Sequence, residues 1–519
     1  MASSGHDKTR QYVMSVDFGT TIVRCHIYDQ QMSVKGVSSK KVELLRPKPG
    51  WSEMDPDMLW TQFVAVGKDA MRAAGITAQD VAGLGIATQR GTFMTWDRET
   101  GVPFHNFITW QDLRAATLTQ EWNQSYKLAA FNGGSKFLFT VSRNRRYLAA
   151  SIVKFRANFV SMRLLWMLLN NMEMQRRAEE GQLMFGTIET WLLWKMTGGE
   201  VFATDYSNAS STGLYDPFIL EWSTALFTLL GIPMSIVPEV KDTSYHFGDS
   251  LPEVFGASIP ITSLVADQQS AMFAECCYDV GDVKVTLGTS LFFNLNTGNK
   301  PHASVAGLYP VIGWKIKDEV VYLAEGCAGD TGTCVEWAQS IGLFEDVSSL
   351  AQIAQSVQDT GGVYFVPAFN GLQAPINDDY ACTLMLGMTR KTTKAHMIRA
   401  ILESLAFRFK LLYETALTET KLPFNLIRAD GGVSNNDFVL QVMADIINQK
   451  IERPSQTDMT SLGAAYLAGL AAGVWKNKEE FKKARNVNRV FTPQGTWNVY
   501  KDIVSEWERA VRRSGHWYR

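Results

Sequence analysis

Two short hairpins, one in each half of this 519-residue chain, constrain its fold most strongly. In the first, a strand over residues 12–16 runs into Asp-Phe-Gly-Thr-Thr at 17–21, and a second strand follows over 22–29. In the second, the apolar runs of 283–293 are broken by Gly-Thr-Ser at 288–290. Glycine and hydroxyl residues between two such runs predict a tight turn, and its exposed amides and hydroxyls suit a phosphate group. The sequence therefore predicts two domains built on one plan.

Polar residues stand where other predicted strands end. Residues 259–266 form an apolar run that stops directly before Asp267, and the apolar run 81–87 ends before Thr-Gln-Arg at 88–90. A late run over 426–429 leads into Asp-Gly-Gly at 430–432. A helix is predicted after it, so this turn suits an anion. Sheets in α/β proteins bind ligands at the carboxyl ends of their strands, so we expect an α/β fold with its site there.

Length and composition limit the remaining classes. The chain is too long for one ordinary core, and we expect an N-terminal domain over 1–260 and a C-terminal, nucleotide-binding domain over 261–519. A net charge of −2 argues against nucleic-acid binding. Six cysteines without a Cys-x-x-Cys pair are typical of a reducing compartment. The first residues carry no secretory signal and no apolar run reaches the length of a membrane span, so we expect a cytoplasmic protein without a transmembrane segment.

A basic segment at about 122–172 interrupts the first domain. It has no acidic residue between Glu121 and Glu173, and its charged side chains are interleaved with aromatic ones. One interpretation is a solvated, partly irregular surface insertion; the other is a docking patch for an anionic lipid surface or a protein partner. A homodimer is also compatible with the sequence. The basic residues are Lys127, Lys136, Arg143, Arg145, Arg146, Lys154, Arg156 and Arg163.

The chain has no Gly-x-x-x-x-Gly-Lys-Ser/Thr loop, so hairpins would have to hold the phosphates. Two glycine-threonine hairpins and a late Asp-Gly-Gly turn resemble the phosphate-binding arrangement of actin-like ATPases. That resemblance implies two actin-like (ribonuclease H-like) domains with a catalytic cleft between them.

A more specific resemblance is to the FGGY carbohydrate kinases and, within them, to the kinases that phosphorylate glycerol, in particular a divergent branch. It covers residues 12 to 510. The segments that carry it are 17–21, 50–60, Thr-Gln-Arg at 88–90, Trp-Gln-Asp-Leu-Arg at 110–114, Phe-Gly-Thr at 185–187, Ala-Asp-Gln-Gln at 266–269, 387–403, 430–432 and 462–469.

This resemblance implies ATP-dependent phosphorylation of glycerol to sn-glycerol 3-phosphate, with ATP and Mg²⁺. Asp267 would be the general base, and Asp17 would face the metal ion. The polyol would be bound by Arg90, Trp110, Asp267, Gln268 and Phe292. The nucleotide and its phosphates would be bound by Thr20, Thr21, Arg24, Thr289, Gly332, Gly432 and Asn436.

The pocket also departs from that family. Glycerol kinases have Arg-Glu where this chain has Arg90-Gly91, a pocket tyrosine where it has about Asn158, and a lysine where it has Arg163. A carboxylate that would accept hydrogen bonds from the substrate hydroxyls is therefore missing. Two alternatives stay open: a kinase for another polyol or sugar, and a nucleotide-binding regulatory protein with weak catalysis.

Overall fold

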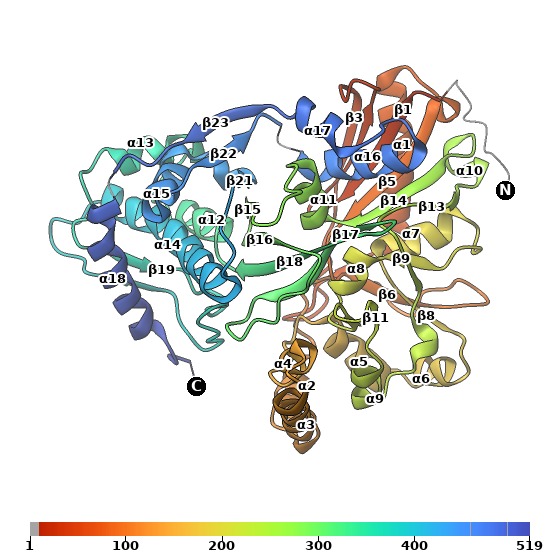
Figure 1. Cartoon of the computed structure of the whole chain (residues 1–519), viewed down its shortest axis with the longest axis horizontal. Coiled ribbons are helices and arrows are strands. Elements are labelled where there is room, and N and C mark those ends of the chain that lie inside the picture. The colour runs from red at the N-terminus through yellow and green to blue at the C-terminus, as the bar shows by residue number, and fades with distance from the viewer. Residues whose placement is uncertain (1–9, 457, 496, 519) are drawn as a thin grey trace.

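The protein is organised around two large β-sheets, one in each half of the chain (Figure 1). Its computed structural model describes residues 10–456, 458–495 and 497–518. Within these residues, no helix combines the length and apolar character needed to cross a membrane. The predicted α/β architecture in two halves is confirmed.

The first sheet has six strands in the order β13-β14-β5-β1-β2-β3. Its central strands β1, β5 and β14 pair in parallel, and its other pairs are antiparallel. These central strands are almost entirely apolar and buried because helices cover both faces of the sheet. The strands are β1 (Tyr12–Phe18), β2 (Ile22–Tyr28), β3 (Val34–Lys41), β5 (Val81–Thr88), β13 (Ser244–Asp249) and β14 (Pro260–Ala266).

The second sheet has seven strands in the order β17-β18-β16-β15-β21-β22-β23. Without β17, this order repeats that of β3-β2-β1-β5-β14-β13, with the same parallel and antiparallel pairs. The expected repetition of one plan is therefore present. The strands are β15 (Val283–Leu287), β16 (Leu291–Gly298), β17 (Tyr309–Ile316), β18 (Glu319–Ala328), β21 (Ile427–Asp430), β22 (Ile451–Pro454) and β23 (Val487–Phe491).

Both predicted hairpins form, as β1–β2 and β15–β16. At the first tip the amide of Gly19 donates to the carbonyl of Ile22, and at the second the amide of Gly288 donates to the carbonyl of Ser290, each over 3.1 Å. The two tips therefore occupy equivalent places in the two sheets.

The helices fill the space around these sheets, and smaller sheets extend both halves. The helices up to the middle of the chain are α1 (Pro56–Ala74), α2 (Ala116–Asn123), α3 (Tyr126–Ser142), α4 (Arg145–Ala150), α5 (Val160–Asn170), α6 (Met172–Glu179), α7 (Ile188–Met196), α8 (Tyr206–Ser210), α9 (Thr224–Leu230), α10 (Pro252–Phe255) and α11 (Asp267–Ala274). Those that follow are α12 (Gly332–Ser340), α13 (Leu350–Gln355), α14 (Lys394–Thr420), α15 (Asp437–Ile447), α16 (Met459–Ala472), α17 (Lys478–Ala484) and α18 (Trp497–Ser514). The smaller sheets comprise β4 (Glu53–Met54), β6 (Phe93–Asp97), β7 (Phe107–Ile108), β8 (Leu183–Thr187), β9 (Ala203–Asp205), β10 (Tyr215–Asp216), β11 (Glu221–Trp222), β12 (Glu239–Lys241), β19 (Tyr364–Val366) and β20 (Leu384–Leu386).

The two halves do not divide at residue 260, where we expected the boundary. Strand β14 begins there and belongs to the first sheet, beside β5. Helix α16 also returns to the first sheet, and in Figure 1 it lies beside the red and orange strands. The approach is close because Gly85 of β5 has no side chain: a Cβ there would lie 2.2 Å from the carbonyl oxygen of Ala464. Small residues in both elements thus allow a late helix to complete the first domain.

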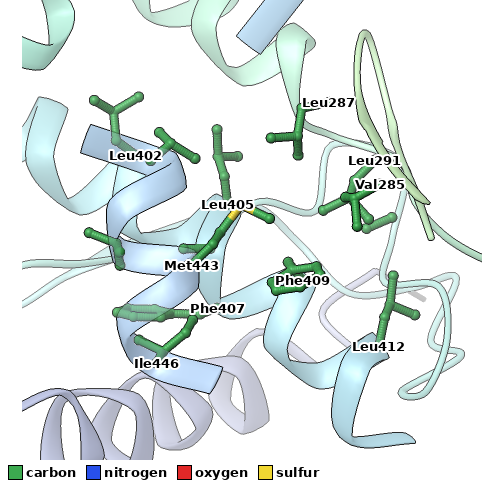
Figure 2. Packing of buried hydrophobic residues seen from close by; sticks show 14 of the residues in the cluster. Val285, Leu287, Leu291, Leu402, Leu405, Phe407, Phe409, Leu412, Met443 and Ile446 are labelled. Atoms are coloured by element: carbon green, nitrogen blue, oxygen red, sulfur yellow. The ribbon is translucent and has the colours of Figure 1, made fainter. Parts of the chain in front are cut away.

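The core of the second half lies between its sheet and the helices α14 and α15 (Figure 2). Leu405 and Phe409 of α14 face Val285 and Leu291 of the hairpin. The terminal helix α18 also joins this core, since Trp507 is fully buried and its indole nitrogen donates to the carbonyl of Phe365 over 2.7 Å. We expected this helix to be solvated exterior. It packs on the core instead, because its apolar residues recur about once per turn and form one face of the helix.

The basic segment is helical where a partly irregular insertion was expected. Helices α3, α4 and α5 account for most of it. α5 is largely buried against the smaller sheet that contains β6, β7 and β8. α3 is largely exposed and projects from the body of the molecule (Figure 1).

Candidate active site

Asp267 lies at the junction of β14 and α11, as the sequence predicted. Its Oδ1 accepts a hydrogen bond from the amide of Gln268 over 2.7 Å. Burial raises the pKa of this carboxyl, and the neighbouring Arg90 guanidinium opposes the rise. An ionised carboxylate whose pKa lies above the ordinary value is a better proton acceptor, which suits a general base.

Arg90 joins Asp267 to the second half of the chain. Its Nε lies 3.4 Å from Asp267 Oδ1, and its Nη1 donates to both carboxylate oxygens of Glu325, over 2.8 and 2.6 Å. The guanidinium also lies over the ring of Phe292, 5.2 Å from the ring centre. Three of the predicted acceptor residues, Arg90, Asp267 and Phe292, are therefore in one cluster.

Glu325 was missed by sequence reasoning. It lies inside β18, opposite Asn294 of β16, and its side chain is almost completely buried. A signal was available: Glu325 is the only charged residue between Glu319 and Asp330, in a run that is otherwise apolar or small. Buried glutamates are rare without a partner, so this position predicts an ion pair with a basic residue from elsewhere in the chain.

Trp110 attaches to the first hairpin. Its indole nitrogen donates to Thr20 Oγ1 over 3.0 Å, and the Thr20 hydroxyl donates to the side chain of Gln89 over 3.1 Å. Gln89 adjoins Arg90 at the end of β5, so these bonds bring the hairpin tip to the acceptor cluster. Thr21 is exposed at the same tip.

Gln268 is held by a second residue that the sequence did not reveal. Lys284 of β15 is fully buried, and its ammonium donates to Gln268 Oε1 over 2.8 Å. This contact links α11 to the strand that leads into the second hairpin. A lysine in a run of β-branched residues was again the available signal.

Asp17 stands opposite Arg24 across the β1–β2 pair. Burial raises the pKa of Asp17 to about 7, and the negative charge of Asp267 acts in the same direction. Arg24 forms an ion pair with Asp458 over 2.9 Å, directly before α16. Arg24 is therefore tied to a carboxylate at the place where it was expected to meet a phosphate.

Two mutually repelling carboxylates, Asp17 and Asp267, lie near each other at this site. Asp267 is close enough for its charge to raise the pKa of Asp17. Among the described residues, no three carboxylate, imidazole or thiol groups come together to hold a metal by themselves. Magnesium commonly takes one or two protein carboxylates and completes its shell with phosphates and water, so the pair fits Mg²⁺ that arrives with a nucleotide.

The second hairpin packs against the start of α12. The amide of Gly332 donates to the carbonyl of Gly288 over 2.9 Å, and the amide of Thr331 donates to the carbonyl of Thr289 over 3.1 Å. A Cβ on Gly332 would lie 2.8 Å from that Gly288 oxygen. Thr289 and Gly332, both predicted to bind the nucleotide, are therefore in direct contact.

The Asp-Gly-Gly turn follows β21, which pairs with β15. A Cβ on Gly431 would lie 2.7 Å from the backbone of Leu287, whereas Gly432 faces open space. Packing thus explains the first glycine and leaves the second available to a ligand. Asn436 caps α15, because its Oδ1 accepts from the amides of Phe438 and Val439.

The three positions that depart from the family pattern, Gly91, Asn158 and Arg163, are connected by hydrogen bonds. Gly91 has a φ of +67°, a conformation that favours glycine. Its carbonyl accepts from Arg163 over 2.7 Å, and Arg163 also donates to the carbonyls of Asn158 and Thr109. Arg163 is fully buried, and burial lowers its pKa to about 9. Backbone carbonyls around one arginine thus surround the position where the family pattern has a carboxylate.

The family of the chain follows from comparison with known proteins. The N-terminal domain of the FGGY family of carbohydrate kinases matches residues 12–274, and its C-terminal domain matches residues 283–472. The chain belongs to the FGGY family of carbohydrate kinases. The first match ends with α11 and the second begins with β15, which agrees with the membership of β14 in the first sheet.

Individual relatives of this FGGY kinase are similar over nearly their full length. The protein named Glycerol kinase 5 in Danio rerio is 52% identical over 521 residues, which cover 99% of this chain and 98% of that one. A crystal structure of Plasmodium falciparum glycerol kinase with ADP has a TM-score of 0.87 at 32% identity, over 97% of this chain and 98% of that one. A ligand-bound xylulose kinase from Lactobacillus acidophilus has a TM-score of 0.82 at 21% identity, over 97% and 98% of the two chains, which shows the fold alone.

Proposed function

We propose that this FGGY kinase transfers the terminal phosphoryl group of ATP to glycerol and forms sn-glycerol 3-phosphate. The observation that carries the proposal is the cluster of Asp267, Arg90 and Phe292 at the end of β14, next to the tip of the first hairpin. The similarity to proteins named as glycerol kinases supports the choice of acceptor.

Each residue of this cluster has a separate role in the reaction. Phosphoryl transfer needs an aligned hydroxyl, neutralised charge and a group that takes the hydroxyl proton. Asp267 takes the proton, which moves from the attacking hydroxyl to a carboxylate oxygen. Arg90 holds that carboxylate in place, while Phe292 and Trp110 would pack against the carbon backbone of the polyol. Glu325 balances the charge of Arg90 and leaves Asp267 free to act as a base.

The nucleotide would be bound between the second hairpin and the turn after β21. We assign Thr289, Gly332, Gly432 and Asn436 to it, with Thr20 and Thr21 near its phosphates and Arg24 reaching them only if it leaves Asp458. Mg²⁺, when bound at Asp17, would neutralise charge on the phosphates. The six cysteines are all free thiols, which fits a reducing compartment, and we place the protein in the cytoplasm.

A second acceptor class, a larger polyol or a sugar, is favoured by the wall at Gly91. The wall is closely packed, since a Cβ on Gly91 would already contact Val160 at 3.6 Å, and what it offers a substrate is backbone carbonyl oxygens. A substrate with one more hydroxyl could use the carbonyl-lined wall that Arg163 organises.

The test is ADP release from Mg-ATP by the purified protein with glycerol, with longer polyols and pentoses, and without an acceptor. The proposal predicts acceptor-dependent ADP release that is fastest with glycerol. Release that is faster with another polyol would transfer the same chemistry to that acceptor. Nucleotide binding without acceptor-dependent release would contradict the kinase proposal and favour a regulatory protein.

A further inference from the structure

Helix α3 is apolar on a side that the protein does not cover. It lies in the basic segment and forms the tip of the projection below the body of the molecule in Figure 1. A helix that is apolar on its outer as well as its inner side is expected in a core or at a membrane, not in water. We therefore expect the exposed side of α3 to bind a partner.

The two sides of α3 can be separated residue by residue. Leu128 and Ser135 are buried on the inner side, toward the body. On the outer side, Tyr126, Phe137 and Val141 have exposed fractions of 79%, 68% and 71%. Their spacing of eleven and four residues places them on one face of an α-helix, which we call the outer stripe. Large apolar residues exposed singly are ordinary, but a stripe of three on one projecting helix is not.

Basic side chains flank the outer stripe. Helical spacing places Lys127 and Lys136 on opposite sides of it, and both are exposed. Within the described part of the chain neither forms an ion pair, whereas Arg146 and Lys154 of the same segment are paired with Asp216 and Asp379. No acidic residue occurs between Glu121 and Glu173 to offset these charges.

We propose that the outer stripe and its flanking lysines bind an anionic lipid surface. An exposed apolar stripe between basic side chains is the pattern of helices that lie in the membrane interface: the apolar side chains enter the headgroup boundary and the lysines meet anionic headgroups. A second copy of the chain would bring two basic patches together, so like-charge repulsion disfavours a dimer through this face. The inference does not depend on which acceptor the kinase uses.

The test is co-sedimentation of the full-length protein with vesicles at low salt. One set contains phosphatidylcholine only, and in the other about a third of the lipid is phosphatidylserine. The proposal predicts binding to the anionic vesicles that weakens as salt is raised. Phe137→Ser with Val141→Ser, and separately Lys127→Glu with Lys136→Glu, should each lower the partition coefficient at least about tenfold.

The matched control is Lys450→Glu with Lys483→Glu, which changes the net charge equally on exposed lysines near β22 and in α17, at the opposite end of the molecule (Figure 1). It should keep most of the binding, and all variants should keep wild-type ADP release and thermal unfolding in the absence of vesicles. No binding at low salt, equal binding to both vesicle types, or an equal loss in the control would each overturn the proposal. So would self-association that the α3 variants abolish in a protein that ignores vesicles.

Discussion

At the scale of single residues, the acceptor cluster is one arginine shared by two carboxylates. Arg90 is 3.4 Å from Asp267 but donates two shorter bonds to Glu325. The stronger pair with Glu325 limits how far Arg90 can lower the pKa of Asp267, whose carboxyl stays above its ordinary value.

Glu325→Gln tests this arrangement. The variant keeps the shape of the side chain but removes its charge, so Arg90 should turn toward Asp267 and weaken it as a base. We expect kcat to fall at least about tenfold and the free energy of unfolding to fall by about 1–3 kcal/mol. Steady-state kinetics and denaturant unfolding measure the two effects.

The control is Glu319→Gln at the half-buried start of the same strand, where Glu319 pairs with Lys478. That pair is partly solvated, so its loss should change the free energy of unfolding by less than about 1 kcal/mol and leave kcat unchanged. Equal effects of the two variants would remove Glu325 from the acceptor cluster.

Glu275 makes the stability depend on pH. It is the C-cap residue of α11, is fully buried and lies 3.2 Å from Arg485; burial raises its pKa to about 7. Between its ordinary pKa near 4.5 and pH 7, the folded protein keeps a proton there that the unfolded chain has lost. The free energy of unfolding therefore falls as pH rises through this window and stays low above it.

Glu275→Gln should remove about 1–3 kcal/mol of that decrease between pH 5 and pH 8, as read from denaturant unfolding at both values. Part of the decrease should remain, because Asp17 and Asp205 also have raised pKa values. Glu253→Gln, at an exposed position, serves as the control and should change nothing. An unchanged pH dependence in Glu275→Gln would show that this carboxyl is not protonated in the folded state.

At the scale of elements, close packing between α16 and α11 positions Asp267, the proposed general base. α11 begins with Asp267, and a Cβ on Gly463 of α16 would lie 1.9 Å from the carbonyl oxygen of Ser270 in α11. The small residues of α16 thus set the distance between the two helices. A change there reaches Asp267 through a shift of its own helix.

Gly463→Ala should move α11 and lower the free energy of unfolding by about 1–3 kcal/mol, as expected for an overpacked core. The kcat should fall with it, because Asp267 moves with the helix. Gly133→Ala in α3 is the control: nothing lies within 4 Å of its would-be Cβ, so alanine should be neutral or stabilise the helix by about 0.5–1 kcal/mol. A stable, fully active Gly463→Ala would contradict the proposed role of this contact.

Sequence reasoning recovered the elements whose signal is local. The two hairpins, the strand that ends before Asp267 and the small-residue helix α16 all carry their pattern within a few residues. It missed Glu325 and Lys284, because each is a single charge inside an apolar strand and its partner lies in another element, 235 residues away for Glu325 and 16 residues away for Lys284. It also placed the boundary at residue 260, since the pairing of β14 with β5 leaves no mark on either strand.

At the scale of the whole molecule, polar contacts at the site join the two halves. Arg90 pairs with Glu325 and Gln268 with Lys284, and both contacts link the first sheet or α11 to a strand of the second sheet. Arg24 pairs with Asp458, which precedes the helix α16 that packs on the first sheet, so this contact stays within the first domain. Relative movement of the halves must therefore break or remake contacts of the acceptor cluster, which couples closure to the assembly of the site.

The measurement that tests the central claim most directly is glycerol-dependent ADP release by Asp267→Asn, with ADP affinity determined by calorimetry on the same preparation. The account predicts unchanged thermal unfolding and ADP affinity within about threefold, with kcat lower by at least about a hundredfold, the usual effect of losing an acid–base group. Wild-type turnover in a folded, ADP-binding Asp267→Asn protein would contradict it.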